Sequence, residues 1–227
     1  MNGELKVTRR PGRPVGQSDD LTDTELRQLI ALPDRRTREG LRDYVVLLLL
    51  VNTPMRKGEL VSLKVANLLD EGEFTYVTYQ GLKKRKRRNK VTGEVEEKQR
   101  PYWLKIPVGR GVFDSIWRYV RQENRGTKIS GEAPLIQTLG KFGPYEKRGI
   151  TPDAVDLIVA KYVKAAGIRR RITPHSFRAT YLTMRAAGRD PATLLGLSGH
   201  ADLRGILPYI RSSEEKRREA ALSHQYE

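Results

Sequence analysis

The pattern of apolar and polar positions along the chain predicts a mainly helical protein. The segment from Leu21 opens with Thr22 and, three residues later, Glu25, which is the pattern of a capping box at a helix start. Its apolar residues then recur at helical spacing. A second, longer helix is predicted over residues 38–51, and a short helix follows it. The longest apolar run, 45–51, is too short to cross a bilayer, so it indicates a buried helix.

Four later segments carry helix signals. In residues 113–120, apolar side chains recur three, four and seven positions apart and form one face. The other three segments open with a capping residue at Thr151, Thr173 or Asp190, each followed by a proline at the first helical position. The last of these helices is predicted to end at Gly199.

The segment 73–79, rich in threonine, tyrosine and valine, is a predicted strand, and the segment 101–108 is a second. Residues 80–100 between them contain a dense run of lysine and arginine and a Thr92-Gly93 turn. They are predicted to form a long hairpin whose first limb is strongly basic. The predicted fold class is therefore α+β, mostly helical with a small antiparallel β-sheet.

Composition and charge narrow the range of partners. The formal net charge is +16 and the isoelectric point is about 10.1. Because the basic residues are clustered, a polyanion is expected as the partner, and nucleic acid is the first candidate. A basic surface without a specific partner is the simpler alternative.

The absence of some residue types excludes several kinds of chemistry. The chain has no cysteine, which rules out disulfides, thiolate metal sites and cysteine nucleophiles. No carboxylate and histidine cluster has metal-ligand spacing, so neither a metal nor another cofactor is expected. The N-terminus is charged and does not resemble a signal peptide. The protein is therefore expected to be soluble and cytoplasmic, associated with the nucleoid, without a membrane partner.

Residues 1–20 show no apolar periodicity and contain several helix breakers, so they are predicted to form a flexible basic arm. Arg9, Arg10 and Arg13 surround a Gly-Arg-Pro core that resembles the AT-hook, an extended minor-groove binder. Extended arms of this kind can place arginines in a narrow minor groove. An ordinary solvated basic tail fits the same residues equally well.

His175 and Arg178 lie three residues apart at a predicted helix start, so they share one helix face. The backbone N–H groups at such a start favour an anion. Together they indicate a site for an oxyanion such as phosphate. The alternative is a structural one, a buried histidine beside an arginine on the helix surface.

The rest of the chain favours the anion site. Upstream of these two residues is Arg56 at another helix start, and downstream are His200 and, nine residues later, Tyr209. In this order and spacing they resemble the tyrosine recombinase/phage integrase family over residues 21–210. Three motifs carry the resemblance: Arg56-Lys57-Gly58-Glu59-Leu60, His175-Ser176-Phe177-Arg178 and Leu197-Ser198-Gly199-His200.

The resemblance implies a role for each of these residues. Arg56 and Arg178 would clamp a phosphodiester, and Tyr209 would be the nucleophile that forms a 3′-phosphotyrosyl bond without metal or ATP. His175 would accept the proton of the tyrosine, and His200 would donate a hydrogen bond to the phosphate. Tyr181 is expected in the core, and Tyr226 in the tail is a weaker rival nucleophile.

In the family, a lysine on the hairpin after the first motif protonates the leaving 5′-oxygen. Lys83 is the preferred candidate because it follows Gln80-Gly81-Leu82, although Lys84 and Lys86 lie close to the same position. The basic limb of the hairpin is also expected to contact DNA phosphates. Its candidate residues are Lys84, Arg85, Lys86, Arg87 and Arg88.

The chain departs from the family pattern in three places. Ala179 follows Arg178 where a basic residue is common, and Pro208 is predicted to break any helix that leads into Tyr209. Only about 20 residues precede the predicted catalytic domain, where the family usually has a helical domain that clamps the other face of the DNA. The chain is therefore expected to be either a short recombinase with the catalytic domain alone or a fragment.

The resulting expectation is a site-specific DNA recombinase of a mobile element, with an arm over 1–20, a catalytic domain over 21–211 and a tail over 212–227 that docks on a neighbouring subunit. Double-stranded DNA is the expected partner, with assembly to a dimer or tetramer and an accessory protein in place of the clamp. The enzymatic alternatives are a type IB topoisomerase-like enzyme and a resolvase. The non-enzymatic alternative is a DNA-binding regulator on the same scaffold.

Overall fold

The structure, a computed structural model, describes residues 20–81, 85–88, 95–98, 102–139, 148–186, 190–199 and 203–210. The helices are α1 (Asp23–Ala31), α2 (Arg38–Asn52), α3 (Lys57–Val61), η1 (Val65–Asn67), α4 (Arg110–Glu123), α5 (Pro152–Ala165), α6 (Pro174–Ala186), α7 (Pro191–Ser198), η2 (Leu203–Gly205) and α8 (Leu207–Ile210). The strands are β1 (Leu68–Glu71), β2 (Phe74–Gly81), β3 (Arg85–Arg88), β4 (Val95–Lys98) and β5 (Tyr102–Val108). Long helices beside small antiparallel sheets confirm the predicted α+β class.

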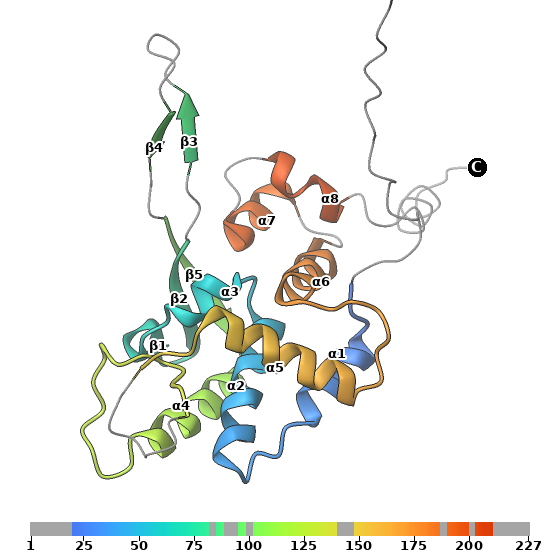
Figure 1. Ribbon diagram of the computed structural model, residues 1–227. Coiled ribbons are helices and arrows are strands. Elements are labelled where there is room, and N and C mark those ends of the chain that lie inside the picture. Colours follow the sequence, from blue (N-terminus) through green and yellow to red (C-terminus); the bar gives the residue numbers. More distant parts are fainter. Residues whose placement is uncertain are drawn as a thin grey trace, which may run out of the picture.

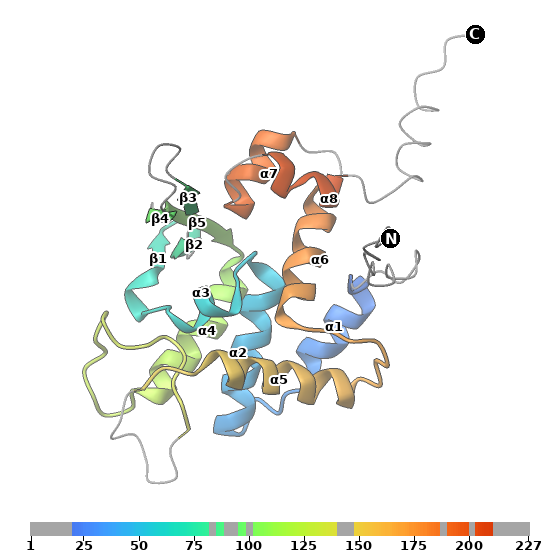
Figure 2. The ribbon, with the colours of Figure 1, turned by 45° about the horizontal axis from the view of Figure 1, so that its top comes forward.

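Helix α2 lies at the centre of the helical part and is buried along most of its length. Helices α1, α4, α5 and α6 all contact it, and Figures 1 and 2 show it between them. The residues from Val45 to Leu50 are at most 5% exposed. The apolar run is therefore a buried helix segment, as predicted. Within the described ranges, no helix is long and apolar enough to cross a membrane.

Several helix boundaries follow the signals in the sequence. At α1, the N–H of Glu25 donates to Oγ1 of Thr22 at 3.2 Å, and the N–H of Thr22 donates to Oε2 of Glu25 at 2.9 Å. The side chains of Thr151 and Asp190 accept hydrogen bonds from backbone N–H groups at the starts of α5 and α7. Helix α7 ends at Gly199, whose φ of 61° suits glycine. Local hydrogen bonding therefore sets these boundaries as predicted.

The central sheet has the strand order β1-β2-β5, and both pairings are antiparallel. Strands β2 and β5 correspond to the two predicted strands. Along β2, Val77 and Tyr79 are buried, whereas Gln80 is exposed, as alternation along a strand requires. Strand β1 was missed because its four residues carry too short a pattern. It forms because Gly72, with a φ of 77°, turns the chain back into β2.

The predicted hairpin is present in the described part of its limbs. The backbones of β3 and β4 pair antiparallel, with Arg85 opposite Lys98 and Arg88 opposite Val95. Figure 1 shows that the two strands extend beyond β2 and β5, away from α4. The predicted Thr92-Gly93 turn lies outside the described residues.

The prediction about Pro208 was wrong for the helix that carries Tyr209. The chain turns at Ile206, and Pro208 then lies in the first turn of α8 instead of breaking a helix. A proline in the first turn loses no intrahelical hydrogen bond, because N–H groups there have no partner within the helix. Tyr209 is therefore on α8, which contacts α6.

Candidate active site

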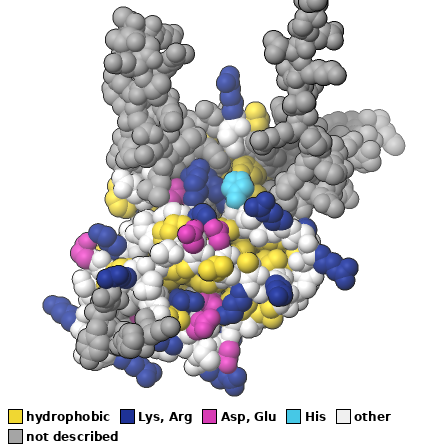
Figure 3. All heavy atoms as spheres, in the orientation of Figure 1, with side chains coloured by type: hydrophobic (Ala, Val, Ile, Leu, Met, Phe, Trp, Pro, Cys, Tyr) yellow, Lys and Arg dark blue, Asp and Glu magenta, His cyan; other side chains and the backbone are white. Residues whose placement is uncertain are grey.

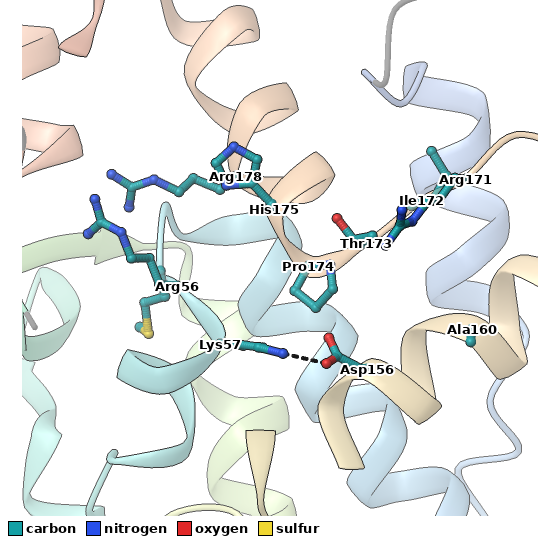
Figure 4. A pocket seen from close by; sticks show the side chains of 11 residues that line it. Arg56, Lys57, Asp156, Ala160, Arg171, Ile172, Thr173, Pro174, His175 and Arg178 are labelled. Atoms are coloured by element: carbon teal, nitrogen blue, oxygen red, sulfur yellow. Dashed lines mark hydrogen bonds and ion pairs between the residues drawn. The ribbon is translucent and has the colours of Figure 1, made fainter. Parts of the chain in front are cut away.

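A pocket of about 680 Å³ opens where the start of α3, one side of α5 and the start of α6 meet. Figure 4 shows Arg56, His175 and Arg178 close together on one side of it and Lys57 and Asp156 on another. Figure 3 shows lysine and arginine side chains gathered around the histidine on this face of the molecule. The pocket therefore collects three of the residues that the sequence motifs single out.

Arg178 is the largest fully buried side chain of the site, with 2% of its surface exposed. Its Nη1 donates to the carbonyl of Pro54, in the loop before α3, and its Nη2 donates to the carbonyl of Ser198 at 2.7 Å, at the end of α7. A guanidinium has five N–H donors in a fixed plane. Two carbonyls from separate elements therefore fix the orientation of this plane, and they connect α6 to the loop before α3 and to α7.

The electrostatics of Arg178 favour an anion beside it. Burial lowers the pKa of its guanidinium, and the positive charge of Arg56 lowers the pKa further. The nearby Glu59, Tyr79 and Tyr209 act in the opposite direction. An arginine stays protonated at neutral pH even so. Two guanidinium groups held side by side repel each other, and a bound oxyanion relieves that repulsion.

Arg56 is held by a buried carboxylate. Its backbone N–H donates to Oε2 of Glu59 at 2.7 Å, and its Nη1 donates to Oε1 of the same residue at 3.0 Å. The side chain of Glu59 is 0% exposed, whereas that of Arg56 is 35% exposed. Glu59 therefore fixes Arg56 at the start of α3 while part of its guanidinium still faces the pocket, next to that of Arg178 (Figure 4).

His175 and Arg178 share a helix face and line the same pocket, as the sequence predicts. The structural alternative was a buried histidine beside a surface arginine, and the burial is the reverse: His175 is exposed and Arg178 is buried. At the start of this helix, the N–H of Thr173 donates to Oγ of Ser176 at 3.2 Å. That bond orients the turn that presents His175.

Tyr209 lies on the α6 side of the site. Its backbone N–H donates to the carbonyl of Ile206 at 3.0 Å, and the residue is partly exposed. Its hydroxyl is close enough to Arg178 to influence the pKa of that guanidinium. Tyr181 on α6 is 3% exposed, with the guanidinium of Arg185 3.6 Å from the centre of its ring, so it belongs to the core as predicted.

An ion pair that was not predicted borders the pocket. The ammonium group of Lys57 donates to Oδ2 of Asp156 and so connects α3 to α5 (Figure 4). No sequence pattern indicates this pair, because the two residues are far apart in the chain. The two carbonyls that bind Arg178 were missed for a similar reason, since backbone acceptors carry no side-chain pattern.

Several predicted residues lie outside what the structure describes. These are Arg9, Arg10, Arg13, Lys83, Lys84 and His200, together with Tyr226 in the tail. For Arg85, Lys86, Arg87 and Arg88, the backbone in β3 is described but the side chains are not. Their roles stay predictions. Across the described ranges, no cluster of three or more histidine, cysteine or acidic residues could hold a metal ion.

The chemistry of the described site is that of an oxyanion pocket. Two guanidinium groups converge, one buried carboxylate balances part of their charge, and a histidine and a phenol lie at the edge. Planar guanidinium groups bind two oxygens of a phosphate at once. The arrangement can hold a phosphate group and stabilise negative charge that develops on its oxygens.

A comparison of this chain with known protein families identifies the class to which the fold and the site belong. The family model described as the phage integrase family matches residues 19–216. The chain therefore belongs to the phage integrase family.

Individual relatives agree with this assignment. Tyrosine recombinase XerA of Pyrococcus furiosus is 27% identical over 221 residues, which cover 97% of this chain and 66% of the relative. Tyrosine recombinase XerD of Neisseria meningitidis serogroup A is 31% identical over 185 residues, which cover 81% of this chain and 55% of the relative. The chain thus spans between about half and two thirds of the length of these curated relatives.

Solved structures show the same fold. The structure of the Tn1549 transposon integrase in complex with circular intermediate DNA superposes with a TM-score of 0.64 at 21% identity. The match covers 94% of this chain and 67% of that one. At this identity the likeness concerns the fold.

Proposed function

We propose that this protein is a site-specific DNA recombinase that cuts and rejoins duplex DNA through Tyr209. The observation that carries the proposal is that Arg56 at the start of α3 and His175 and Arg178 of α6 line one oxyanion pocket, with Tyr209 of α8 close enough to influence Arg178. A DNA-binding surface needs positive charge, but it does not need a buried guanidinium held by two carbonyls beside a tyrosine. The family and the tyrosine recombinases among its relatives support the same function.

The proposed reaction is a transesterification. The phenolic oxygen of Tyr209 attacks the scissile phosphorus, forms a 3′-phosphotyrosyl bond and displaces the 5′-oxygen of the next nucleotide. The phenol loses its proton and the leaving oxygen gains one. Because the covalent link preserves the energy of the phosphodiester bond, the reverse attack by a 5′-hydroxyl rejoins the strand without ATP or metal.

Arg56 and Arg178 are proposed to bind the non-bridging oxygens of the scissile phosphate. Negative charge builds on these oxygens in the transition state, and preorganised cations stabilise it at no cost of reorganisation. Each guanidinium is expected to contribute roughly 3 kcal/mol, the scale of one oxyanion donor. Glu59 and the carbonyls of Pro54 and Ser198 supply the preorganisation.

The proton transfers need further residues. We assign acceptance of the phenolic proton to His175, since histidine is the most common general base in enzymes and this one lines the pocket. Lys83 is proposed to protonate the leaving 5′-oxygen, with Lys84 and Lys86 as alternatives, and His200 to donate a hydrogen bond to the phosphate. These assignments rest on the sequence motifs.

Duplex DNA at specific sites is the proposed substrate, because the net charge is +16 and a related fold is solved in complex with DNA. The basic arm over 1–20 and the β3 limb would add contacts to the catalytic domain over 21–211. The tail over 212–227 would dock on a neighbouring subunit in a dimer or tetramer. A cytoplasmic location near the nucleoid and an accessory DNA-binding protein complete the proposal.

The test is covalent capture of DNA. The protein is mixed with nicked duplexes that carry the sequence flanking its own gene, and the products are separated on a denaturing gel. A covalent band is expected from the wild type and from Tyr226→Phe, whereas Tyr209→Phe should bind the DNA and give no band. A covalent band that persists in Tyr209→Phe would contradict the assignment of the nucleophile.

Two alternatives remain testable with the same material. A type IB topoisomerase-like enzyme would relax supercoiled plasmid as a monomer and would not exchange strands between two sites. A regulator would bind DNA equally well as wild type and Tyr209→Phe, and neither would form a covalent product. Recombinants between paired sites support the recombinase against both.

A further inference from the structure

Helix α4 presents a group of arginines that the proposed reaction does not use. Arg118 and Arg121 lie on its exposed side, and Arg125 follows two residues after its end. Together with Asp114 and Gln122, these three arginines line a hollow of about 470 Å³. We call the surface formed by Arg118, Arg121 and Arg125 the α4 arginine face.

These arginines differ from other surface arginines that form ion pairs. Arg27, Arg36 and Arg110 are equally on the surface, but each forms an ion pair with a neighbouring carboxylate, at 2.6, 2.9 and 2.6 Å. Within the described ranges, no ion pair involves the α4 arginine face. Arg121 donates only to the carbonyl of Trp117, at 3.4 Å. The charge of this face is therefore available to a partner.

The opposite side of α4 fixes the face in place. Phe113, Ile116 and Tyr119 are buried, and the hydroxyl of Tyr119 accepts a hydrogen bond from the N–H of Gln137 at 2.9 Å. Glu123, with a side chain 1% exposed, binds Arg38 of α2 at 2.7 Å. The arginines therefore project from a rigid backbone, which reduces the entropy lost when they bind a ligand.

The position of a cation near a helix C-terminus has a simpler explanation, which does not account for the whole face. The helix dipole favours positive side chains in the last turn. Arg121 lies in that turn, but Arg118 precedes it and Arg125 follows the helix. Three arginines on one side, with one carboxylate from Asp114 among them, leave an excess of two positive charges around the hollow.

The face is separate from the candidate active site. Figures 1 and 2 both place α4 away from α7 and α8, and no residue of α4 lines the active-site pocket. Successive phosphates of one DNA strand follow at about 3.4 Å along the duplex axis, and residues three apart on a helix are separated by about 4.5 Å. Closely spaced guanidinium groups can therefore each bind a phosphate.

We propose that the α4 arginine face binds the phosphate backbone of a second duplex segment while the active site holds the first. This inference rests on the proposed function in taking DNA as the polyanion. Phosphate contacts made by arginine carry no sequence information by themselves, so the second segment is bound without sequence preference. Such a contact retains a second DNA near the enzyme before strand exchange.

The experiment compares two charge-matched variants. The test variant carries Arg118→Gln, Arg121→Gln and Arg125→Gln, and the control carries Arg27→Gln, Arg36→Gln and Arg110→Gln, which remove the same charge from paired positions. Each protein is first loaded on an immobilised nicked duplex, and a fluorescent second duplex of unrelated sequence is then added. Thermal unfolding verifies that both variants are folded, since surface substitutions usually change stability little.

The wild type and the control should retain the second duplex, and the test variant should retain about tenfold less at low salt. All three should give equal covalent product on the first duplex. Equal retention of the second duplex by the test variant and the control would overturn the inference. Retention by none of the three proteins would also overturn it, and this is the result expected if the face binds an acidic protein. A parallel loss of covalent product would place the face within the primary DNA site and equally refute it. Absence of covalent product and of DNA binding in the wild type would instead refute the proposed function.

Discussion

At the scale of single residues, the two arginines of the site differ in burial and in the groups that orient them. Arg178 is almost fully enclosed and oriented by two carbonyls, whereas Arg56 is more exposed and oriented by one carboxylate. A buried cation without such partners would be costly. The two carbonyl contacts offset the cost of burying the charge of Arg178, and they also hold its guanidinium in position for a phosphate.

Replacement of Arg178 by lysine tests this orientation. An ammonium group cannot reach the Pro54 and Ser198 carbonyls and a phosphate at once, so the covalent cleavage rate is expected to fall about 10²–10³-fold. DNA affinity should fall much less, because many other phosphate contacts remain. Arg185→Lys, on the same helix but stacked on Tyr181, is the control and should cleave at the wild-type rate. Single-turnover cleavage and binding titrations provide the two measurements.

Glu25 shows how one residue links two elements through its charge. Its carboxylate accepts from both Nη atoms of Arg170 at 2.6 Å and also takes part in the capping box of α1. Hydrogen bonding to Arg170 lowers the pKa of Glu25 from 4.5 to about 2. A lowered pKa in the folded state means that the ionised form is stabilised by folding.

Glu25→Gln is therefore expected to destabilise the protein in a pH-dependent way. At neutral pH the free energy of unfolding should decrease by about 1.5–3 kcal/mol, the range for hydrogen bonds to charged groups. The stabilisation by Glu25 is complete above its unfolded pKa of 4.5 and disappears as pH falls towards about 2. Urea titrations of both proteins across this range measure the difference. A difference that stays constant with pH would contradict the linkage, and Glu132→Gln, in an exposed ion pair, serves as control.

At the scale of elements, the helices were predicted best and the short elements worst. Helices α2, α4 and α5 have long apolar faces, and the residues of these faces are buried as expected. Strand β1 was missed and Pro208 was misjudged, because in a segment of four residues the neighbouring turn decides the conformation. The pairing of α3 with α5 through Lys57 and Asp156 was also invisible in the sequence.

Asp156→Asn tests what that ion pair does. Both side chains are 43% exposed, so the pair should contribute less than about 1 kcal/mol to stability. Removal of a carboxylate from the pocket wall frees Lys57 for a phosphate and removes a repulsion of about 0.5 kcal/mol at a distance of about 8 Å in water. DNA affinity is therefore expected to increase about twofold. Asp153→Asn, on the same helix but outside the pocket lining, is the control and should change the DNA affinity less. Weaker DNA binding by Asp156→Asn than by the wild type would refute the argument.

At the scale of the whole molecule, the net charge of +16 is expected to dominate the binding of the proposed DNA substrate. Each phosphate that is neutralised on duplex DNA releases counterions and lowers the affinity by about 0.9 log unit per log unit of salt. Affinity measured between about 50 and 200 mM salt should therefore fall steeply, by several log units if six or more phosphates are contacted. A flat response would exclude an interface dominated by the DNA backbone.

The sequence by itself determined the α+β class, most helix boundaries and the identity of the candidate catalytic residues. It could do so because amphipathic periodicity, capping residues and family motifs are local patterns. Only the tertiary structure decided that His175 is exposed and Arg178 buried, that carbonyls of Pro54 and Ser198 orient Arg178, and that Lys57 pairs with Asp156. These features depend on contacts between residues far apart in the chain, and on backbone acceptors that every residue type provides.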